Sequence, residues 1–253
     1  MVAVEQRQRV GLWMLSMDAA ATVRGEVEPP RRILGLARGD RDATRIVYIV
    51  TRPRFERGAT LILHDAVPPR VADHLWLWLP GLMAPREIQT ASLRALVPGT
   101  GLSYEDARGW IATDKYRFRT LERGADEVAI EAWPQADSVG VSLGVSRIQI
   151  RVDPKRLVVT GVATFDAAGN LVRTYEATDF VEVGGCWRTR RVVTHHEMRF
   201  TDAVITYRYR ALDRPPPPEL FRPPGDGDAF NRRFLEWRDG VGLAAEFPDS
   251  LPQ

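Results

Sequence analysis

Short runs in which apolar and polar residues alternate occupy most of the chain between residues 28 and 212. A period of two residues is typical of strands with one buried and one solvated face. Gly, Asp and Asn separate many of these runs at hairpin length, as at residues 166–170. The pattern predicts about ten strands in an antiparallel meander. They are expected near residues 31–37, 45–50, 59–64, 74–79, 115–122, 127–133, 146–152, 157–165, 171–183, 187–200 and 203–212.

Two of these runs predict a sheet with one apolar and one wet face. Residues 147–152 and 204–210 each place apolar side chains on one side and Arg, Gln or Thr on the other. The apolar sides consist of Ile148, Ile150, Val152, Ile205, Tyr207 and Tyr209. One or two helices cannot cover so large an apolar face. It must therefore curl on itself, pair with a second copy or bind an apolar ligand.

Helix signals are few, and they suggest how the chain is divided. Ser103 with Asp106 three residues later is typical of a capping box and predicts a short helix. The prolines at 215–218 cannot join a ladder or a helix, so an extended spacer is expected there. We expect the sheet domain at residues 1–212. The Pro-rich spacer and a C-terminal tail with a short helix near 228–238 are expected at 213–253.

The first apolar run, residues 10–17, follows two arginines and loosely imitates a signal peptide. It is short for a signal core and ends at Asp18, which favours a first structural element instead. The longest nearly charge-free apolar stretch, residues 75–85, contains two prolines and falls well below the roughly 20 residues of a spanning helix. The sequence thus predicts no membrane-spanning segment.

Composition excludes several classes of protein. The 253 residues are 44% hydrophobic and 27% charged, which is ordinary for a globular chain. The formal net charge is +2, and the longest basic block is residues 188–191. Nucleic acid is therefore not an expected partner.

Candidate chemistry is sparse. His195 and His196 form the only histidine cluster, and neighbouring residues of a strand point to opposite faces, so they are not expected to hold one metal. Residues 140–144 only loosely resemble a nucleophile elbow and lie in an all-β setting. We predict no catalytic residues, no metal and no cofactor. A hydrolase that uses Cys186 or His195 remains the minor alternative.

Aromatic residues are paired along two predicted strands. Trp76 and Trp78 share one face of their strand, and Tyr116 and Phe118 share one face of theirs. Such stripes are most often core, and the lining of a lipid-accommodating groove is the second interpretation.

An ordered set of motifs carries a family resemblance. RPRFERGATL at 52–61 is followed by WLWLP at 76–80, REI at 86–88 and GTGLSYED at 99–106. Later segments, AWP at 132–134, RVD at 151–153 and FDAAGNL at 165–171, agree more loosely. Over roughly residues 28–212 the chain resembles the outer-membrane lipoprotein-sorting family, the LolA-like group. GTGL replaces the family's Gly-Ser-Asp-Phe, and Trp78 stands where Tyr is usual.

The resemblance implies a mainly β (α+β) fold, a strongly curved antiparallel sheet that forms an incomplete barrel with a few short helices at its open face. It also implies a non-enzymatic periplasmic carrier that binds lipid or lipoprotein acyl chains in a hydrophobic groove for transfer towards the outer membrane. An inner-membrane lipid or lipoprotein exporter would be a partner. The expected groove lining is Trp76, Trp78, Tyr116, Phe118, Ile148, Ile150, Ile205 and Tyr207.

A rival from another class is a structural or protein-interaction module. Its apolar groove would be capped by a second copy or by its own C-terminal tail, where Phe230, Phe234 and Trp237 could fill it. The pattern of residues leaves both readings open.

Overall fold

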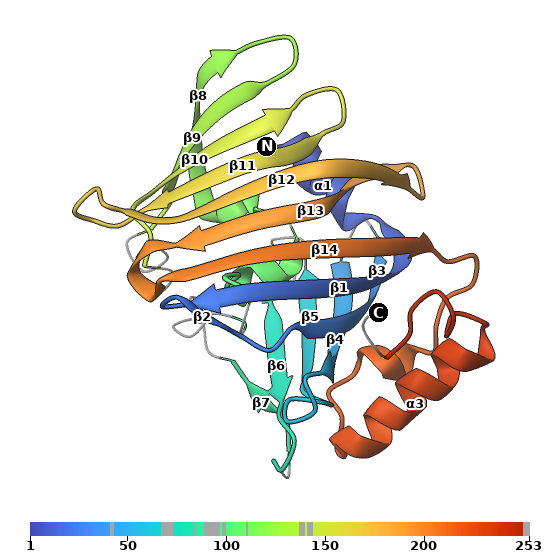
Figure 1. The fold of residues 1–253 in the computed structure, drawn as a ribbon. Coiled ribbons are helices and arrows are strands. Elements are labelled where there is room, and N and C mark those ends of the chain that lie inside the picture. The colour runs from blue at the N-terminus through green and yellow to red at the C-terminus, as the bar shows by residue number, and fades with distance from the viewer. Residues whose placement is uncertain are drawn as a thin grey trace. The chain divides into compact units, whose positions relative to one another are not determined.

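The computed structural model describes residues 1–40, 43–66, 73–82, 84–88, 97, 100–109, 111–136, 140 and 144–249 (Figure 1). The chain divides into two compact units. Unit 1 comprises Met1–Arg9, Ala19–Pro29 and Gln89–Thr206, and unit 2 comprises Val10–Asp18, Pro30–Ile88 and Tyr207–Gln253. Each unit has an apolar core of its own.

Strands dominate both units. They are β1 (Gly11–Val23), β2 (Glu26–Val27), β3 (Arg31–Gly39), β4 (Ala43–Arg52), β5 (Thr60–Ala66), β6 (His74–Trp78), β7 (Arg86–Glu87), β8 (Tyr116–Arg123), β9 (Val128–Pro134), β10 (Arg147–Asp153), β11 (Val158–Phe165), β12 (Leu171–Val183), β13 (Cys186–His196) and β14 (Thr201–Ala211). The helices of the described residues are α1 (Val2–Arg9), α3 (Gly227–Gly240) and the short 3₁₀ turns η2 (Glu105–Arg108), η3 (Thr113–Lys115), η4 (Glu197–Arg199) and η5 (Pro218–Phe221).

The strand order confirms the predicted meander. It reads β7-β6-β5-β4-β3-β1-β14-β13-β12-β11-β10-β9-β8, and β2 pairs with β1. Strands that follow one another from β3 to β7 and from β8 to β14 pair antiparallel. Among the described strands, the order ends at β7 and at β8 and does not close. The predicted fold class, a mainly antiparallel sheet that is not a complete barrel, with few helices, is confirmed.

The N-terminal apolar run is a strand of the sheet. Residues 11–23 form β1, which lies between β3 and β14 in the strand order. Met14 is fully buried and Leu15 nearly so. The prediction of a structural element at residues 10–17 is confirmed. Strand β1 was not among the predicted strands because its central residues are buried on both sides and do not alternate.

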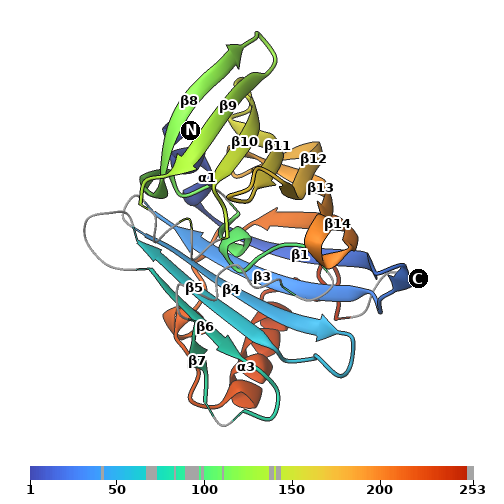
Figure 2. The same ribbon diagram turned by 90° about the vertical axis from the view of Figure 1, so that its left-hand side faces the viewer.

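The core of unit 2 is made by the C-terminal segment on one sheet face, which we call the α3 face. The sheet supplies Met14, Leu34, Leu36, Val47, Ile49 and Ile62, and the segment after residue 217 supplies Leu220, Phe221, Phe230, Phe234, Leu243 and Phe247. Figure 2 shows α3 behind the strands of this unit. Asp226 caps α3 by accepting hydrogen bonds from the amides of Asp228 and Ala229. The helix expected near 228–238 is confirmed, and the domain boundary at residue 212 stays a prediction.

Candidate functional site

The sheet of unit 1 has one apolar and one polar face. Ile148, Ile150 and Val152 of β10 are buried, whereas Arg151 between them is exposed. In β14, Ile205 is fully buried and its neighbour Thr206 is exposed. The predicted alternation is confirmed in both strands.

Helix α1 packs on the apolar face, which we call the α1 face. Val4 of the helix lies in a cluster with Tyr116, Ile130, Ala132, Ile148, Ile150 and Val152. Partly buried side chains surround this cluster, namely Met1, Ile111, Phe118, Val128, Val145, Leu157, Val159 and Val162. The helix is held by polar contacts, because Glu5 accepts a hydrogen bond from the amide of Thr113 (3.0 Å) and pairs with Arg9 (2.9 Å). Val4 is the buried apolar residue that α1 contributes to this cluster, and the side chains around the cluster stay partly exposed.

The segment at 100–109 lies over another part of the α1 face, at β12 to β14. Thr194 Oγ1 donates to the carbonyl oxygen of Thr100 at 2.9 Å. The predicted capping box is present: the amide and hydroxyl of Ser103 donate to Asp106 Oδ2 at 2.6 and 2.7 Å. Only the 3₁₀ turn η2 follows, with Tyr104 rather than Ser103 at its N-cap, and it ends at Gly109 in the left-handed region (φ 81°).

The predicted lining residues fall into different surroundings. Tyr116, Phe118, Ile148 and Ile150 come together in the cluster of the α1 face. Ile205 lies on the same face, because the register pairs it with the buried Val192 of β13. Tyr207 is partly buried and stacks on Tyr209, with ring centroids 5.8 Å apart.

The two tryptophans of β6 lie against unit 2's C-terminal segment. Trp76 pairs in register with Ile62 and packs on the core that Phe230 and Phe234 complete. Trp78 is 4% exposed, and Gly227 at the start of α3 lies directly on its ring. In this structure the chain's own tail occupies that surface. Their role as groove lining stays a prediction.

The contact between Gly227 and Trp78 gives a sharp test of how tightly the tail is seated. A Cβ at residue 227 would overlap the Trp78 ring, although Ala normally stabilises a helix relative to Gly by about 0.5–1 kcal/mol. We expect Gly227→Ala to lower the free energy of unfolding by about 1–3 kcal/mol, as overpacking does. Urea unfolding followed by tryptophan fluorescence measures the change.

The matched control is Gly225→Ala, where an added Cβ meets no atom within 4 Å. This variant should be neutral or slightly stabilising. Equal effects of the two substitutions would contradict the close contact between the tail and β6.

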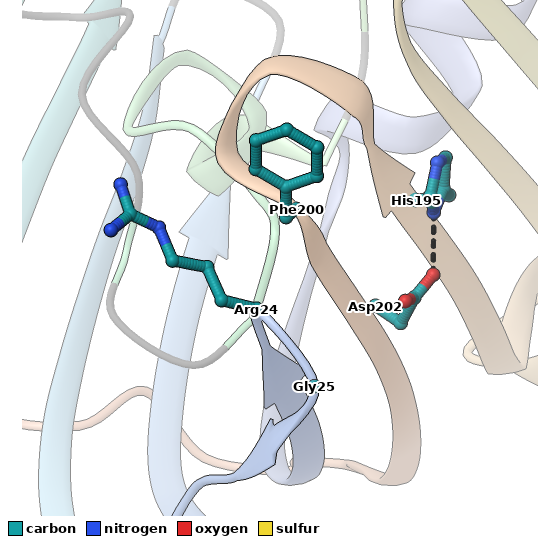
Figure 3. Close-up of a pocket in the computed structure, with 5 residues that line it drawn as sticks. All are labelled: Arg24, Gly25, His195, Phe200 and Asp202. Carbon is teal, nitrogen blue, oxygen red and sulfur yellow. Dashed lines mark hydrogen bonds and ion pairs between the residues drawn. The ribbon is translucent and has the colours of Figure 1, made fainter.

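The histidine pair has the geometry expected from a strand. His195 lies on the polar face, where it is hydrogen-bonded to Asp202 (Figure 3). It also pairs with Glu197 at 3.2 Å. The hydrogen bond that His195 donates to the Asp202 carboxylate raises the pKa of the histidine. Burial lowers the pKa of His196, and the charges of Arg173 and Arg199 lower it further. Within the described ranges, no three His, Cys, Asp or Glu side chains are grouped to hold a metal ion.

A surface hollow of about 480 Å³ adjoins His195. Arg24, Gly25, Phe200 and Asp202 line it with the histidine (Figure 3). The hollow brings together no nucleophile with a base. Cys186, the other residue of the hydrolase alternative, is buried, and its thiol donates to the carbonyl of Arg7 at 3.3 Å. Ser142 of the elbow-like segment lies outside the described residues.

Sequence reasoning did not group the polar residues that the register assembles on the α1 face. Thr164, Arg173, His196 and Thr201 lie in one row across β11 to β14. The signal that could have found them is a charged or polar residue at the apolar phase of a strand, as Arg173 is in β12. Which of these residues become neighbours depends on strand pairing, which single-strand periodicity does not report.

Comparison with known proteins places the fold. A family model whose description reads "Uncharacterized protein" matches residues 42–224. A putative outer membrane lipoprotein-sorting protein domain from Vibrio parahaemolyticus superposes with a TM-score of 0.74 at 19% identity, over 93% of this chain and 97% of that one. The chain belongs to the family of the model that matches residues 42–224, and its fold is LolA-like.

Further structures agree with the LolA-like fold. A DUF1329 family protein from Desulfovibrio piger superposes with a TM-score of 0.76 at 18% identity, over 87% of this chain and 93% of that one. A LolA superfamily protein from Nitrosomonas europaea gives 0.62 at 17% identity, over 87% and 96%. No curated protein matches the chain. Among the described residues, no helix of this LolA-like chain is long and apolar enough to span a membrane.

Proposed function

We propose that this LolA-like chain is a non-enzymatic periplasmic carrier that binds the acyl chains of a lipid or lipidated protein on the α1 face of unit 1. The observation that carries the proposal is the apolar face whose outer residues are only partly buried by the described elements of the chain. Its central residues are buried beneath α1, and partly buried Phe118, Val128 and Val162 extend the apolar surface around them. The fold shared with lipoprotein-sorting domains supports the same assignment.

The binding energy would come from burial of hydrocarbon, at about 0.8 kcal/mol for each CH₂ group. Such binding needs no cofactor and no covalent step. An inner-membrane lipid or lipoprotein exporter would load the carrier, which would release its cargo towards the outer membrane. The lining we propose is Tyr116, Phe118, Ile148, Ile150 and Ile205.

Native mass spectrometry of the purified protein, with solvent extraction of whatever accompanies it, tests the proposal. A discrete added mass that extracts as a lipid or an acylated peptide is the expected result. A clean apo mass, with no uptake of fluorescent fatty acid, would contradict the carrier function.

Two substitutions on neighbouring residues locate the site. Phe118→Asp places a carboxylate on the α1 face, and burying a charge against an acyl chain costs at least about 2 kcal/mol. We expect fatty-acid affinity to fall by at least about tenfold. Arg117→Asp puts the same group on the exposed opposite face and should change affinity by less than about twofold. Equal losses would place binding elsewhere.

One observation favours a second candidate, an interaction module with a self-capped surface. In unit 2, Phe230 and Phe234 of α3 fill the α3 face, as a built-in cap would. A clean apo mass together with release of the tail by a partner protein would favour this function over the carrier.

A further inference from the structure

The α1 face changes from apolar to polar along a single row of paired residues. From β8 to β14 the register joins Phe118, Ala132, Ile148, Thr164, Arg173, His196 and Thr201. The first three residues belong to or pack on the apolar cluster. The last four form what we call the polar row. The adjacent row joins Ile150, Val162, Tyr175, Thr194 and Ala203. Tyr175 is the one ionisable residue among these five.

Arg173 is the cation of the polar row. Its side chain is 16% exposed. It makes a bidentate ion pair with Asp106, in which Nη2 lies 3.1 Å from Oδ1 and Nη1 contacts Oδ2. A guanidinium held in this way presents its paired donors to a planar anion. The Asp106 carboxylate thus marks where an anionic group sits on the α1 face.

His196, which pairs with Arg173 in the register, has a ring nitrogen that lacks a hydrogen-bond partner among the described residues. This atom, Nδ1, is buried. A buried polar atom left unpaired is costly, and a polar group of a ligand would relieve that cost. The guanidinium groups of Arg173 and Arg199 are close enough to disfavour a positive charge on the ring. Two guanidinium groups thus lie near the imidazole, one of them paired with Asp106.

The polar row lies within reach of the acyl-chain surface. Ile148 and Arg173 are separated by two strand spacings, about 10 Å. A single amphiphile can span this distance, with its chain on the partly buried residues around the cluster and its head at Arg173.

We infer that Arg173 and His196 bind the phosphate headgroup of an anionic lipid whose acyl chain lies on the α1 face, with the headgroup replacing the Asp106 carboxylate on Arg173. The inference rests on the proposed carrier function and narrows its cargo from acyl chains in general to phosphate-bearing lipids. Because one anion replaces another, the charge around Arg173 stays balanced. The Asp106 carboxylate of the segment at 100–109 and the headgroup therefore compete for the same guanidinium.

A matched pair of ligands tests this. 1-Palmitoyl lysophosphatidic acid and 1-monopalmitoyl glycerol share chain and glycerol and differ by the phosphate. Displacement of Nile red, a neutral dye, below the micellar concentration of each lipid reports the two affinities. The full-length wild type should prefer the phosphate lipid by about tenfold or more, the strength of a charge-assisted hydrogen-bond pair.

Variants with opposite expected signs separate the headgroup site from a merely structural role. Arg173→Gln should bring the ratio of the two affinities close to one. Asp106→Asn removes the competing carboxylate but keeps an oxygen for Ser103, so it should raise the ratio above that of the wild type. Arg191→Gln, on the same strand as His196 but on its exposed opposite face, should leave the ratio unchanged. The double variant Asp106→Asn with Arg173→Gln retains a neutral pair. It replaces Arg173→Gln in the same measurement if that variant alone does not fold.

The outcomes are distinguishable. Equal wild-type affinities for the two lipids, or a preference that survives Arg173→Gln, would overturn the headgroup site while leaving the carrier function intact. Failure of both lipids to displace the dye would overturn the carrier function itself. If inorganic phosphate competes as effectively as the phosphate lipid itself, the site binds a free anion. That result would overturn the assignment of a lipid headgroup.

Discussion

Phe234→Ala is expected to lower the free energy of unfolding by about 3–5 kcal/mol, as removal of a fully buried aromatic side chain does. Phe234 has no exposed surface and packs in the unit 2 core, with its ring centroid 6.1 Å from that of Trp237. Because the core joins α3 to β1, β3, β4 and β5, the cavity would weaken the attachment of the tail to the sheet. Urea unfolding followed by circular dichroism measures the loss.

Arg233→Ala on the exposed side of the same helix is the control and should change the free energy of unfolding by less than about 0.5 kcal/mol. If Phe234→Ala left global unfolding unchanged and created a surface that binds Nile red, the tail would be a removable cap. That result would support the interaction-module function over an integral tail.

Arg32→Met is expected to lower the free energy of unfolding by about 3–5 kcal/mol, because it leaves one partner of a buried ion pair without its counter-charge. The Arg32 side chain has no exposed surface, and its Nε and Nη2 atoms each lie 2.6 Å from an oxygen of Asp18. Its Nη1 atom donates to the carbonyl of Pro248 at 3.1 Å. One guanidinium thus joins β1, β3 and the end of the tail within unit 2.

The control is the exposed pair of Arg57 and Asp249, whose charged atoms are 3.5 Å apart. Arg57→Met should change the free energy of unfolding by no more than about 1 kcal/mol. Asp18→Asn added to Arg32→Met should recover part of the loss, since the two side chains are coupled. A double variant no more stable than Arg32→Met would contradict an uncompensated carboxylate as the cause.

Several of the described strands that sequence periodicity found have one buried and one wet face. In β10 and β14 the burial pattern follows the alternation of the residues. Strand β3, also found, is buried at almost every position, and there the flanking turn residues rather than alternation marked it. Strand β1 has a similarly continuous pattern with no such flanking signal, and it was seen only as an apolar run.

Helix α1 was not predicted because its inward side chains are largely polar. Glu5, Gln8 and Arg9 are buried with Val4, and Glu5 and Gln8 find hydrogen-bond partners in distant parts of unit 1. Gln8 Nε2, for example, donates to the carbonyl of Trp187 at 3.0 Å. A helix that depends on such long-range pairings carries little apolar periodicity of its own.

The sequence by itself determined what is local in this protein. The side of a strand on which a residue lies, the Ser103 and Asp106 capping box, and the α3 helix depend on neighbours within a few residues. These local signals were enough for the fold class and for a family resemblance spread over an ordered set of motifs. Of the eight residues that they grouped as a lining, Tyr116, Phe118, Ile148 and Ile150 come together in one cluster.

The tertiary structure alone decided what covers each apolar face and where charge interrupts it. Trp76 and Trp78 meet the tail, whereas Tyr116 and Phe118 meet α1, and no periodicity distinguishes the two pairs. Arg173 and His196 are 23 positions apart in the chain and become neighbours only through the register of β12 with β13. Register and docking are set by the summed burial of many side chains distant in sequence, so no single segment carries that information.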